Sequence, residues 1–505
     1  MRNYTSNMRV LFKTFVFFAA LTLFVLMFQA PVISQNQQLD DSKIALAIDR
    51  ALIFNKSIDA NMIDVKCQDG IVTLTGIVNN ILAKERALSI SEATKGVRSV
   101  VNNITVKPVI MEDSEIKENV EQALFNDPAT DSWEISVVVD DGVVTLTGTV
   151  ESWAEKKLAE DIAKTVKGIM QIQNNLSVEY KAERNDFEIR QDIVNQLEAS
   201  VWIDEALIEV FVKDGIVKLT GTVGSAAEKR RATGRAWVSG VESVDNSDLK
   251  VEWWARDKMR RSDKYQTRTD EEIKKAVEDA LLHDPRVFAF APEVTVNNGV
   301  VSLTGNVESL RAKKAARQDA LNTIGVVYVK NYLKVRPQKL YSDQQIKEKV
   351  EQAIHVDPML DRLELTITTV NGKVHLNGRV HSEYEKSHAE DIASRQLGVI
   401  EVENNLKVDE EWEPKSDTAI KEDVKNELFW SPFINSDSIE VKVEDGNVVL
   451  QGTVNTRYQA QVAVENAYEG GAKSVLNSLN IKYNYGFPEN QESTNWFYRE
   501  DWYPY

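Results

Sequence analysis

One ten-residue pattern occurs six times in this chain, and it limits what the chain can fold into. The clearest copy is DGVVTLTGTV, at 141–150. The first glycine of the six copies falls at 70, 142, 215, 299, 372 and 446. The intervals between these glycines are 72, 73, 84, 73 and 74 residues. A fixed period of this size indicates a string of similar units. Each unit has roughly 70 residues, which is near the smallest size that folds around its own core.

The pattern predicts a β-hairpin. Asp-Gly or Asn-Gly between two β-rich runs is a strong hairpin signal, because both turn residues must adopt positive φ. After the turn, Val-x-Leu-x-Gly-x-Val recurs in all six copies, while the intervening residues vary. This alternation predicts a strand with one buried and one solvent-facing side. We expect the glycine on the buried side to let a helix lie close over the sheet.

A helix is predicted on each side of the hairpin. Ile116, Val120 and Leu124 are spaced by four upstream of the second hairpin, which is typical of one apolar helix face. Capping-box spacings open two of these first helices: Thr269 with Glu272, and Ser342 with Gln345. A second helix ends at a glycine such as Gly168, and a last strand follows. Each unit is therefore α-β-β-α-β, a three-stranded sheet with two helices on one face.

The order and spacing of these elements resemble the BON domain, a family named for bacterial osmotically inducible and nodulation proteins. The motifs are the hairpin x-G-x-V-x-L-x-G-x-V and the last strand G-V-x-x-V-x-N-x-L-x-V, and the match runs over 38–483. The resemblance implies an α+β fold in a tandem array of six units. It also implies a periplasmic protein of envelope maintenance or osmotic stress, which binds phospholipid or envelope proteins and has no catalytic residues. Two copies depart from the pattern in ways that put the register of the last strand in doubt. The third copy, GVESVDNSDLKV, has one extra residue, and the sixth, GGAKSVLNSLNIKY, doubles the glycine.

The predicted organisation has nine parts. They are a signal peptide or anchor at 1–34, BON-like units at 38–107, 112–180 and 185–252, a basic linker at 253–267, BON-like units at 268–336, 341–409 and 416–483, and an aromatic tail at 484–505.

The N-terminus has the pattern of an export signal. Three basic residues precede an apolar run from Thr14 to Phe28. A run of about 15 residues is typical of a secretory signal rather than a full membrane span, and cleavage after Ser34 fits the pattern. An uncleaved membrane anchor is the alternative. We therefore expect an exported, periplasmic protein.

Charge and reactive residues limit the possible functions. The formal net charge is −18, which argues against binding nucleic acid. The single cysteine, Cys67, stands where other copies have valine, so we expect a buried, inert thiol. His375, His381 and His388 share the fifth unit, but we place them on a wet strand face, in a loop and at a helix start. We predict no metal, no cofactor and no enzymatic activity, with the carboxylates on solvent-facing sides of helices.

Two irregular segments are the candidate binding sites. Between Ala255 and Arg268 there are six basic residues and two acidic ones, directly after two tryptophans. Such a segment suits a lipid headgroup interface. The predicted lipid-binding residues are Trp253, Trp254, Arg256, Lys258, Arg260 and Arg261. The alternative is a solvated linker whose tryptophans pack on the third unit. A hinge here would divide the array into two arms of three units.

The C-terminal tail is the second irregular segment, with eight aromatic residues from Tyr485 to Tyr505. It is predicted to dock a partner through Trp496, Phe497, Trp502 and Tyr503. It can equally cover the exposed edge of the last sheet. An alternative function for the whole chain is a structural spacer or scaffold that binds only proteins and has no lipid affinity.

Overall fold

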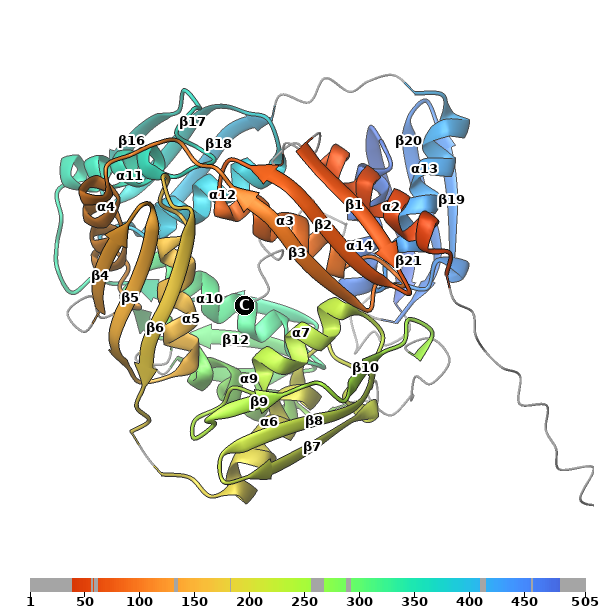
Figure 1. The fold of residues 1–505 in the computed structure, drawn as a ribbon, viewed down its shortest axis with the longest axis horizontal. Coiled ribbons are helices and arrows are strands. Elements are labelled where there is room, and N and C mark those ends of the chain that lie inside the picture. Colours follow the sequence, from red (N-terminus) through yellow and green to blue (C-terminus); the bar gives the residue numbers. More distant parts are fainter. Residues whose placement is uncertain are drawn as a thin grey trace, which may run out of the picture. The chain divides into compact units, whose positions relative to one another are not determined.

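The computed structural model describes residues 39–55, 58, 62–130, 135–181, 183–255, 268–287, 292–408, 415–455 and 457–481. These ranges belong to one of two parts of the chain, Leu39–Tyr505. They contain six similar units, called units 1 to 6 in chain order (Figure 1).

The first three units have the following elements. Unit 1 contains α2 (Asp41–Phe54), β1 (Ile63–Gln68), β2 (Ile71–Val78), α3 (Ile81–Glu92) and β3 (Ser99–Val106). Unit 2 contains α4 (Asp113–Asn126), β4 (Ile135–Asp140), β5 (Val143–Val150), α5 (Trp153–Ala163) and β6 (Gln171–Val178). Unit 3 contains α6 (Asp186–Ala199), the short 3₁₀ helix η2 (Glu205–Leu207), β7 (Ile208–Lys213), β8 (Ile216–Val223), α7 (Ala226–Arg235), β9 (Ser243–Asp245) and β10 (Leu249–Val251).

The last three units repeat this order. Unit 4 contains α9 (Asp270–His283), β11 (Glu293–Asn297), β12 (Val300–Thr304), β13 (Asn306–Val307), α10 (Leu310–Leu321), β14 (Tyr328–Asn331) and β15 (Lys334–Val335). Unit 5 contains α11 (Asp343–Val356), β16 (Thr366–Val370), β17 (Lys373–Val380), α12 (Glu383–Ser394) and β18 (Glu401–Val408). Unit 6 contains α13 (Asp417–Trp430), the 3₁₀ helix η5 (Ser436–Ser438), β19 (Ile439–Glu444), β20 (Asn447–Val454), α14 (Arg457–Glu469) and β21 (Ser474–Ile481).

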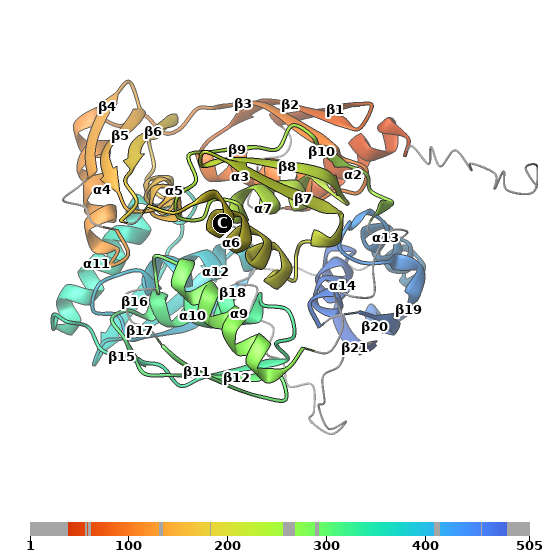
Figure 2. The same ribbon diagram turned by 90° about the horizontal axis from the view of Figure 1, so that it is seen from below.

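Each unit has the predicted α-β-β-α-β order. In unit 1, β1 and β2 form an antiparallel hairpin, and β3 pairs parallel with β2, which is the middle strand. The second helix makes the crossover that a parallel pairing requires. Figures 1 and 2, seen from two directions, both show α2 and α3 on the same face of this sheet.

The hairpin turns have the predicted backbone. The Asp or Asn of each turn has φ between 48° and 53°, and the glycine that follows it also has positive φ. An aspartate at the first residue of the preceding helix fixes each turn. In unit 5, Asp343 accepts the backbone N–H groups of Asn371 and Gly372, both at 2.8 Å. This contact was not predicted from the sequence. It recurs in the other five units: Asp41 with Asp69 and Gly70, Asp113 with Asp141 and Gly142, Asp186 with Asp214 and Gly215, Asp270 with Asn298 and Gly299, and Asp417 with Asp445 and Gly446.

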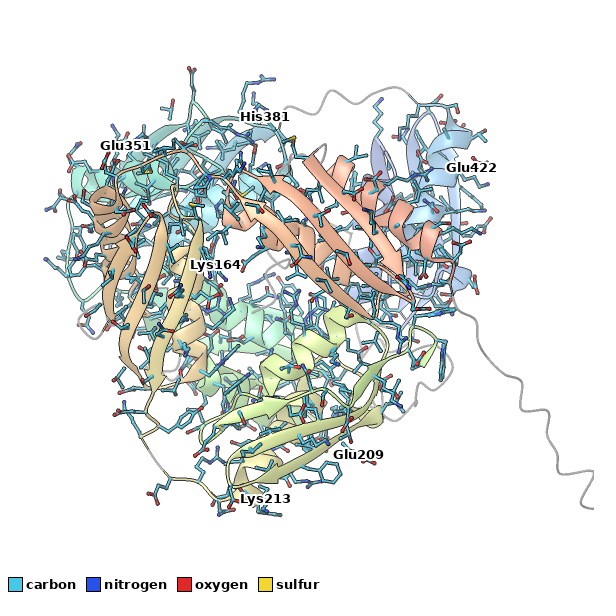
Figure 3. The ribbon with its side chains drawn as sticks, in the orientation of Figure 1. Lys164, Glu209, Lys213, Glu351, His381 and Glu422 are labelled. Carbon is cyan, nitrogen blue, oxygen red and sulfur yellow. The ribbon has the colours of Figure 1, made fainter. Side chains whose placement is uncertain are left out.

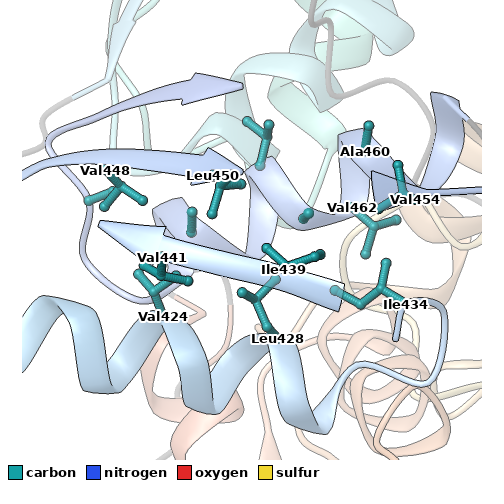
Figure 4. Packing of buried hydrophobic residues seen from close by; sticks show 14 of the residues in the cluster. Val424, Leu428, Ile434, Ile439, Val441, Val448, Leu450, Val454, Ala460 and Val462 are labelled. Atoms are coloured by element: carbon teal, nitrogen blue, oxygen red, sulfur yellow. The ribbon is translucent and has the colours of Figure 1, made fainter. Parts of the chain in front are cut away.

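The core of each unit lies between the sheet and its two helices. Unit 6 is typical: Val448 and Leu450 of β20 are buried together with Val424 and Leu428 of α13, and α14 contributes Ala460 (Figure 4). The alternating pattern of the middle strand therefore predicted the buried side correctly. Both predicted capping boxes are present, and a third, formed by Asn185 and Glu188, opens α6.

The explanation offered for the recurring strand glycine was wrong. In units 1, 3, 5 and 6 the atoms nearest to it belong to the segment just before the first strand, and not to either of the two helices that cover the sheet. A Cβ on Gly452 would lie 2.0 Å from the carbonyl oxygen of Ser438, and one on Gly76 would lie 1.9 Å from that of Met62. Both glycines have φ above 130°. At these positions the glycine is therefore required by a close backbone contact and by a backbone angle that other residues rarely adopt. In unit 4 only the backbone angle applies, because the nearest atom to a Cβ on Gly305 is 3.9 Å away.

The two divergent copies behave differently. In unit 3 the extra residue interrupts the last strand, so that β9 and β10 pair separately with β8. In unit 6 the doubled glycine leaves the pairing intact, and β21 runs parallel to β20 without interruption from Ser474 to Ile481.

Candidate functional site

The second helices of the six units, α3, α5, α7, α10, α12 and α14, contribute to the wall of one cavity of 2080 Å³, called here the inter-unit cavity. Among the described residues that line it, fourteen are lysine or arginine and ten are aspartate or glutamate. The lining is therefore net basic in a chain whose formal net charge is −18. Charged groups keep their hydration in such a cavity unless a ligand supplies complementary charge.

Ion pairs across units hold several of the lining cations. Lys164 of unit 2, which is labelled in Figure 3, directly follows α5 and is almost fully buried. Its ammonium contacts Glu85 of unit 1 at 2.6 Å as well as Glu160 and Asp161 of α5. Burial by itself lowers the pKa of Lys164, but the three carboxylates raise it above its ordinary value. The ammonium group is therefore charged, and it links α5 to α3 rather than offering a free binding charge.

Unit 4 brings two buried carboxyl groups to the same lining. Asp284 follows the end of α9, and Asp319 lies on α10. Burial, and then the charge of Asp284, raise the pKa of Asp319 well above its ordinary value. Burial also acts to raise the pKa of Asp284, but the Arg286 guanidinium outweighs it and lowers that pKa. We interpret the pair as a hydrogen-bonded contact that holds α10 against the end of α9.

The acidic residues are less uniformly exposed than we predicted from the sequence. Asp127, Asp357, Glu228 and Glu385 are all buried. Asp127 pairs with the equally buried Arg311 of unit 4. Buried carboxylates need such partners, because an unpaired charge in the interior is costly. A helix pattern cannot indicate this burial, because the partners of these groups are distant in sequence: Arg311 of another unit for Asp127, and His388 of the same unit for Asp357.

The interpretation of His388 was also wrong. It lies within α12 rather than at a helix start, it is buried, and its Nε2 is 2.7 Å from a carboxylate oxygen of Asp357. His381 is exposed, and His375 is half-buried near Glu403. Within the described part of the chain, no group of three or more His, Cys, Asp and Glu side chains is arranged to hold a metal ion.

Cys67 is half-buried rather than fully buried, and its Sγ lies 3.3 Å from a carboxylate oxygen of Asp41. Burial, followed by the interaction with Asp41, raises the pKa of the Cys67 thiol to about 12. The thiol is therefore protonated at neutral pH, in agreement with the expected lack of reactivity.

The predicted lipid-binding segment is described only at its start. Trp253 and Trp254 are half-buried, and the ammonium of Lys95 in unit 1 lies 5.7 Å from the centre of the Trp253 ring. Arg256, Lys258, Arg260 and Arg261 lie outside the described residues. So do the predicted docking residues of the tail: Trp496, Phe497, Trp502 and Tyr503. None of the helices described is both long enough and apolar enough to cross a membrane.

Comparison with known proteins gives the family. The model of the BON domain matches six stretches, at 40–108, 112–180, 185–252, 269–337, 342–410 and 416–483. The chain belongs to the BON domain family. Among its relatives is the Osmotically-inducible protein Y of Escherichia coli, which is 32% identical over 145 residues, covering 27% of this chain and 72% of that protein.

A second BON relative is the Outer membrane lipoprotein DolP of Haemophilus influenzae, 27% identical over 141 residues, covering 27% of this chain and 72% of the relative. A solved structure of CdsD, a structural protein of the type III secretion system of Chlamydia trachomatis, is 18% identical and covers 40% of this chain and 91% of its own, with a TM-score of 0.12. The six BON units thus resemble proteins whose names place them in osmotic induction and at the outer membrane.

Proposed function

We propose that the chain is a non-enzymatic periplasmic protein of envelope maintenance or osmotic stress, and that it binds the surface of anionic phospholipid membranes. The observation that carries this proposal is the basic segment after unit 3, which has six cations and two acids between Ala255 and Arg268 in a chain of net charge −18. Membership of the BON family and the names of its relatives support a role in the envelope. The N-terminal basic and apolar pattern supports export.

The chemistry of the segment suits a lipid surface. Each lysine or arginine close to an anionic membrane contributes about 1 kcal/mol, and an indole ring prefers the headgroup region. Because the ring of Trp253 already lies near Lys95, we assign the interfacial contact to Trp254 and the cations that follow it. The rest of the acidic surface is repelled by anionic lipid, so binding depends on this segment.

Vesicle flotation of residues 35–505 tests the proposal. We expect flotation with anionic lipid at low salt, none with zwitterionic lipid, and loss at high salt, because screening weakens exposed charge interactions. Changing Trp254, Arg260 and Arg261 to alanine is expected to abolish it. As a control of matched charge, Lys213→Ala with Lys250→Ala removes two exposed cations from the sheet of unit 3 and is expected to leave flotation unchanged.

The scaffold function without lipid affinity predicts a different outcome. If no condition gives flotation, lipid binding by this chain is refuted, and docking through the aromatic tail becomes the function to test. Docking of that kind rests on aromatic burial and is expected to be much less sensitive to salt.

A further inference from the structure

Three equivalent hydrogen bonds connect the first three units to the last three. In each bond the donor is the backbone N–H of the residue that precedes the glycine after a second helix. The acceptor is the backbone carbonyl of the last residue of a first helix in another unit. The bonds are Lys95 to Trp430 at 2.8 Å, Lys167 to Val356 at 2.7 Å, and Ile324 to Ala199 at 2.7 Å. They join unit 1 to unit 6, unit 2 to unit 5, and unit 4 to unit 3.

These bonds use groups that every unit possesses. The last carbonyls of a helix have no partner within the helix, so each first helix ends with acceptors that need a donor. The same joint therefore forms at three places with different side chains around it. Side-chain contacts must decide which units pair.

A further side-chain contact between the first three units and the last three lies outside the joints, between units 3 and 6. The ring of Trp202 lies 4.0 Å from that of Tyr458 and 6.1 Å from that of Phe433, measured between ring centres. The guanidinium of Arg231 lies 4.0 Å from the centre of the Trp202 ring. Ala227 of unit 3 is part of the buried core of unit 6. Aromatic rings with an arginine are typical of the residues that dominate binding energy at protein interfaces.

The pairs that the joints connect have specific side-chain contacts of their own. Between units 3 and 4, the indole N–H of Trp202 donates to the side-chain oxygen of Asn322 at 3.1 Å. Between units 2 and 5, Lys349 bonds Asn126 at 2.6 Å and Lys167 bonds Asp361 at 3.2 Å. Between units 1 and 6, Trp430 packs against the core of unit 1. The Lys349–Asn126 bond is half-buried, and the Lys167–Asp361 bond is exposed.

We propose that units 1–3 and units 4–6 are two arms that recognise each other as binding partners, and that the same surface accepts the second arm of another copy of this chain. The three hydrogen bonds join residues that lie outside the segment at 256–267 between the arms, so on this proposal continuity of that segment is not needed for binding. In an intact chain this segment keeps the two arms at a high local concentration, which favours closure within one copy. Once the arms have opened, the joints form equally well between copies, which is arm exchange.

The test begins with the full chain carrying a specific protease site inserted between Arg261 and Ser262. After cleavage, size-exclusion chromatography with light scattering is expected to show both fragments in one peak at the mass of the uncut chain. Two cut samples with different affinity tags are then mixed, opened briefly in mild urea and returned to buffer. We expect each tag to capture the complementary fragment of the other sample. Fragments that elute separately at micromolar concentration would overturn the proposal, and so would arms that never exchange.

A pair of tryptophan variants locates the surface. Trp202→Ala removes a contact between the arms and is expected to weaken fragment association by about 30-fold or more. Trp237→Ala removes a ring that stacks on Trp153 within the first arm, at 5.4 Å between ring centres, and is expected to leave association nearly unchanged. Equal effects of the two variants would contradict the assignment. Circular dichroism of each variant checks its folding, and cleavage of the unsubstituted chain tests the proposal even if one variant does not fold.

Discussion

Glu427 on α13 is expected to make unit 6 less stable as the pH rises from 5 to 8. Burial, followed by the charges of Glu469 and Asp423, raises the pKa of Glu427 from 4.5 to about 7, while Arg50 and Lys415 oppose the rise. A carboxyl group with a raised pKa binds its proton more tightly in the folded protein than in the unfolded chain. The resulting stability is fully present below pH 4.5 and is lost as the pH rises to about 7.

The magnitude follows from these two pKa values. One pH unit corresponds to about 1.36 kcal/mol, so the interval from 4.5 to about 7 gives about 3 kcal/mol as an upper limit. Glu427→Gln keeps the shape of the protonated side chain and cannot ionise. The free energy needed to open unit 6 should therefore become larger in Glu427→Gln than in the wild type as the pH rises. The difference between the two proteins should increase by about 2 kcal/mol between pH 5 and pH 8.

Hydrogen exchange measured by mass spectrometry on peptides from α13 and α14 is the suitable assay, because it reports the opening of one unit within a six-unit chain. Variant and wild type are compared at the same pH, so that intrinsic exchange rates cancel. Glu422→Gln is the control, since Glu422 lies on the same helix and is exposed (Figure 3). If the difference between Glu427→Gln and wild type does not grow with pH, or if Glu422→Gln gives the same growth, the reasoning is refuted.

Three further predictions concern the repeated scaffold and the thiol. Asp343→Ala removes the acceptor of two turn N–H groups and should lower the free energy of unfolding, measured in urea, by about 1 kcal/mol. The control, Glu351→Ala on the exposed side of α11, should change this free energy by less than about 0.5 kcal/mol. Gly452→Ala should lower the free energy of unfolding by at least about 2 kcal/mol. Gly305→Ala should lower it by less, because the nearest atom to an added Cβ there is 3.9 Å away. Equal losses of stability in the two variants would contradict the steric explanation. Cys67 should react with iodoacetamide at pH 8 at least about 100-fold more slowly in the native chain than in the unfolded one, because folding raises the pKa of its thiol from 9.0 to about 12. Similar reaction rates in the two states would contradict the burial argument.

Features set by local sequence were predicted well. Asp-Gly and Asn-Gly turns, alternating strands and helices with one apolar face depend on a few neighbouring residues, and the six copies agree with one another. The helix-to-turn contact was missed although the sequence contains its signal. An aspartate precedes each turn residue by 28 positions in all six copies, as Asp343 precedes Asn371. Aligning the copies on their turns would have indicated this contact.

Residues buried by contacts that are distant in sequence could not be predicted in this way. Asp127 follows the end of α4 and is buried against Arg311 of another unit, and His388 on α12 is buried against Asp357 of its own unit. The recurring strand glycine was recognised, but its reason was not, because the carbonyl that approaches it comes from the start of the neighbouring strand. In both cases the deciding atom is distant in sequence.

The sequence by itself determined that this chain consists of six BON units. Turn geometry, the alternation of buried and exposed strand residues, and helix periodicity are local properties, and each copy shows them independently. Only the tertiary structure decided that unit 1 joins unit 6, unit 2 joins unit 5 and unit 3 joins unit 4. The physical reason is that the joints are made by backbone N–H and carbonyl groups. Every unit possesses these groups whatever its sequence, so the sequence does not indicate which of them pair. The choice between partners rests on a few side chains that lie far apart along the chain, such as Trp202 with Asn322 of unit 4 and Asn126 with Lys349 of unit 5.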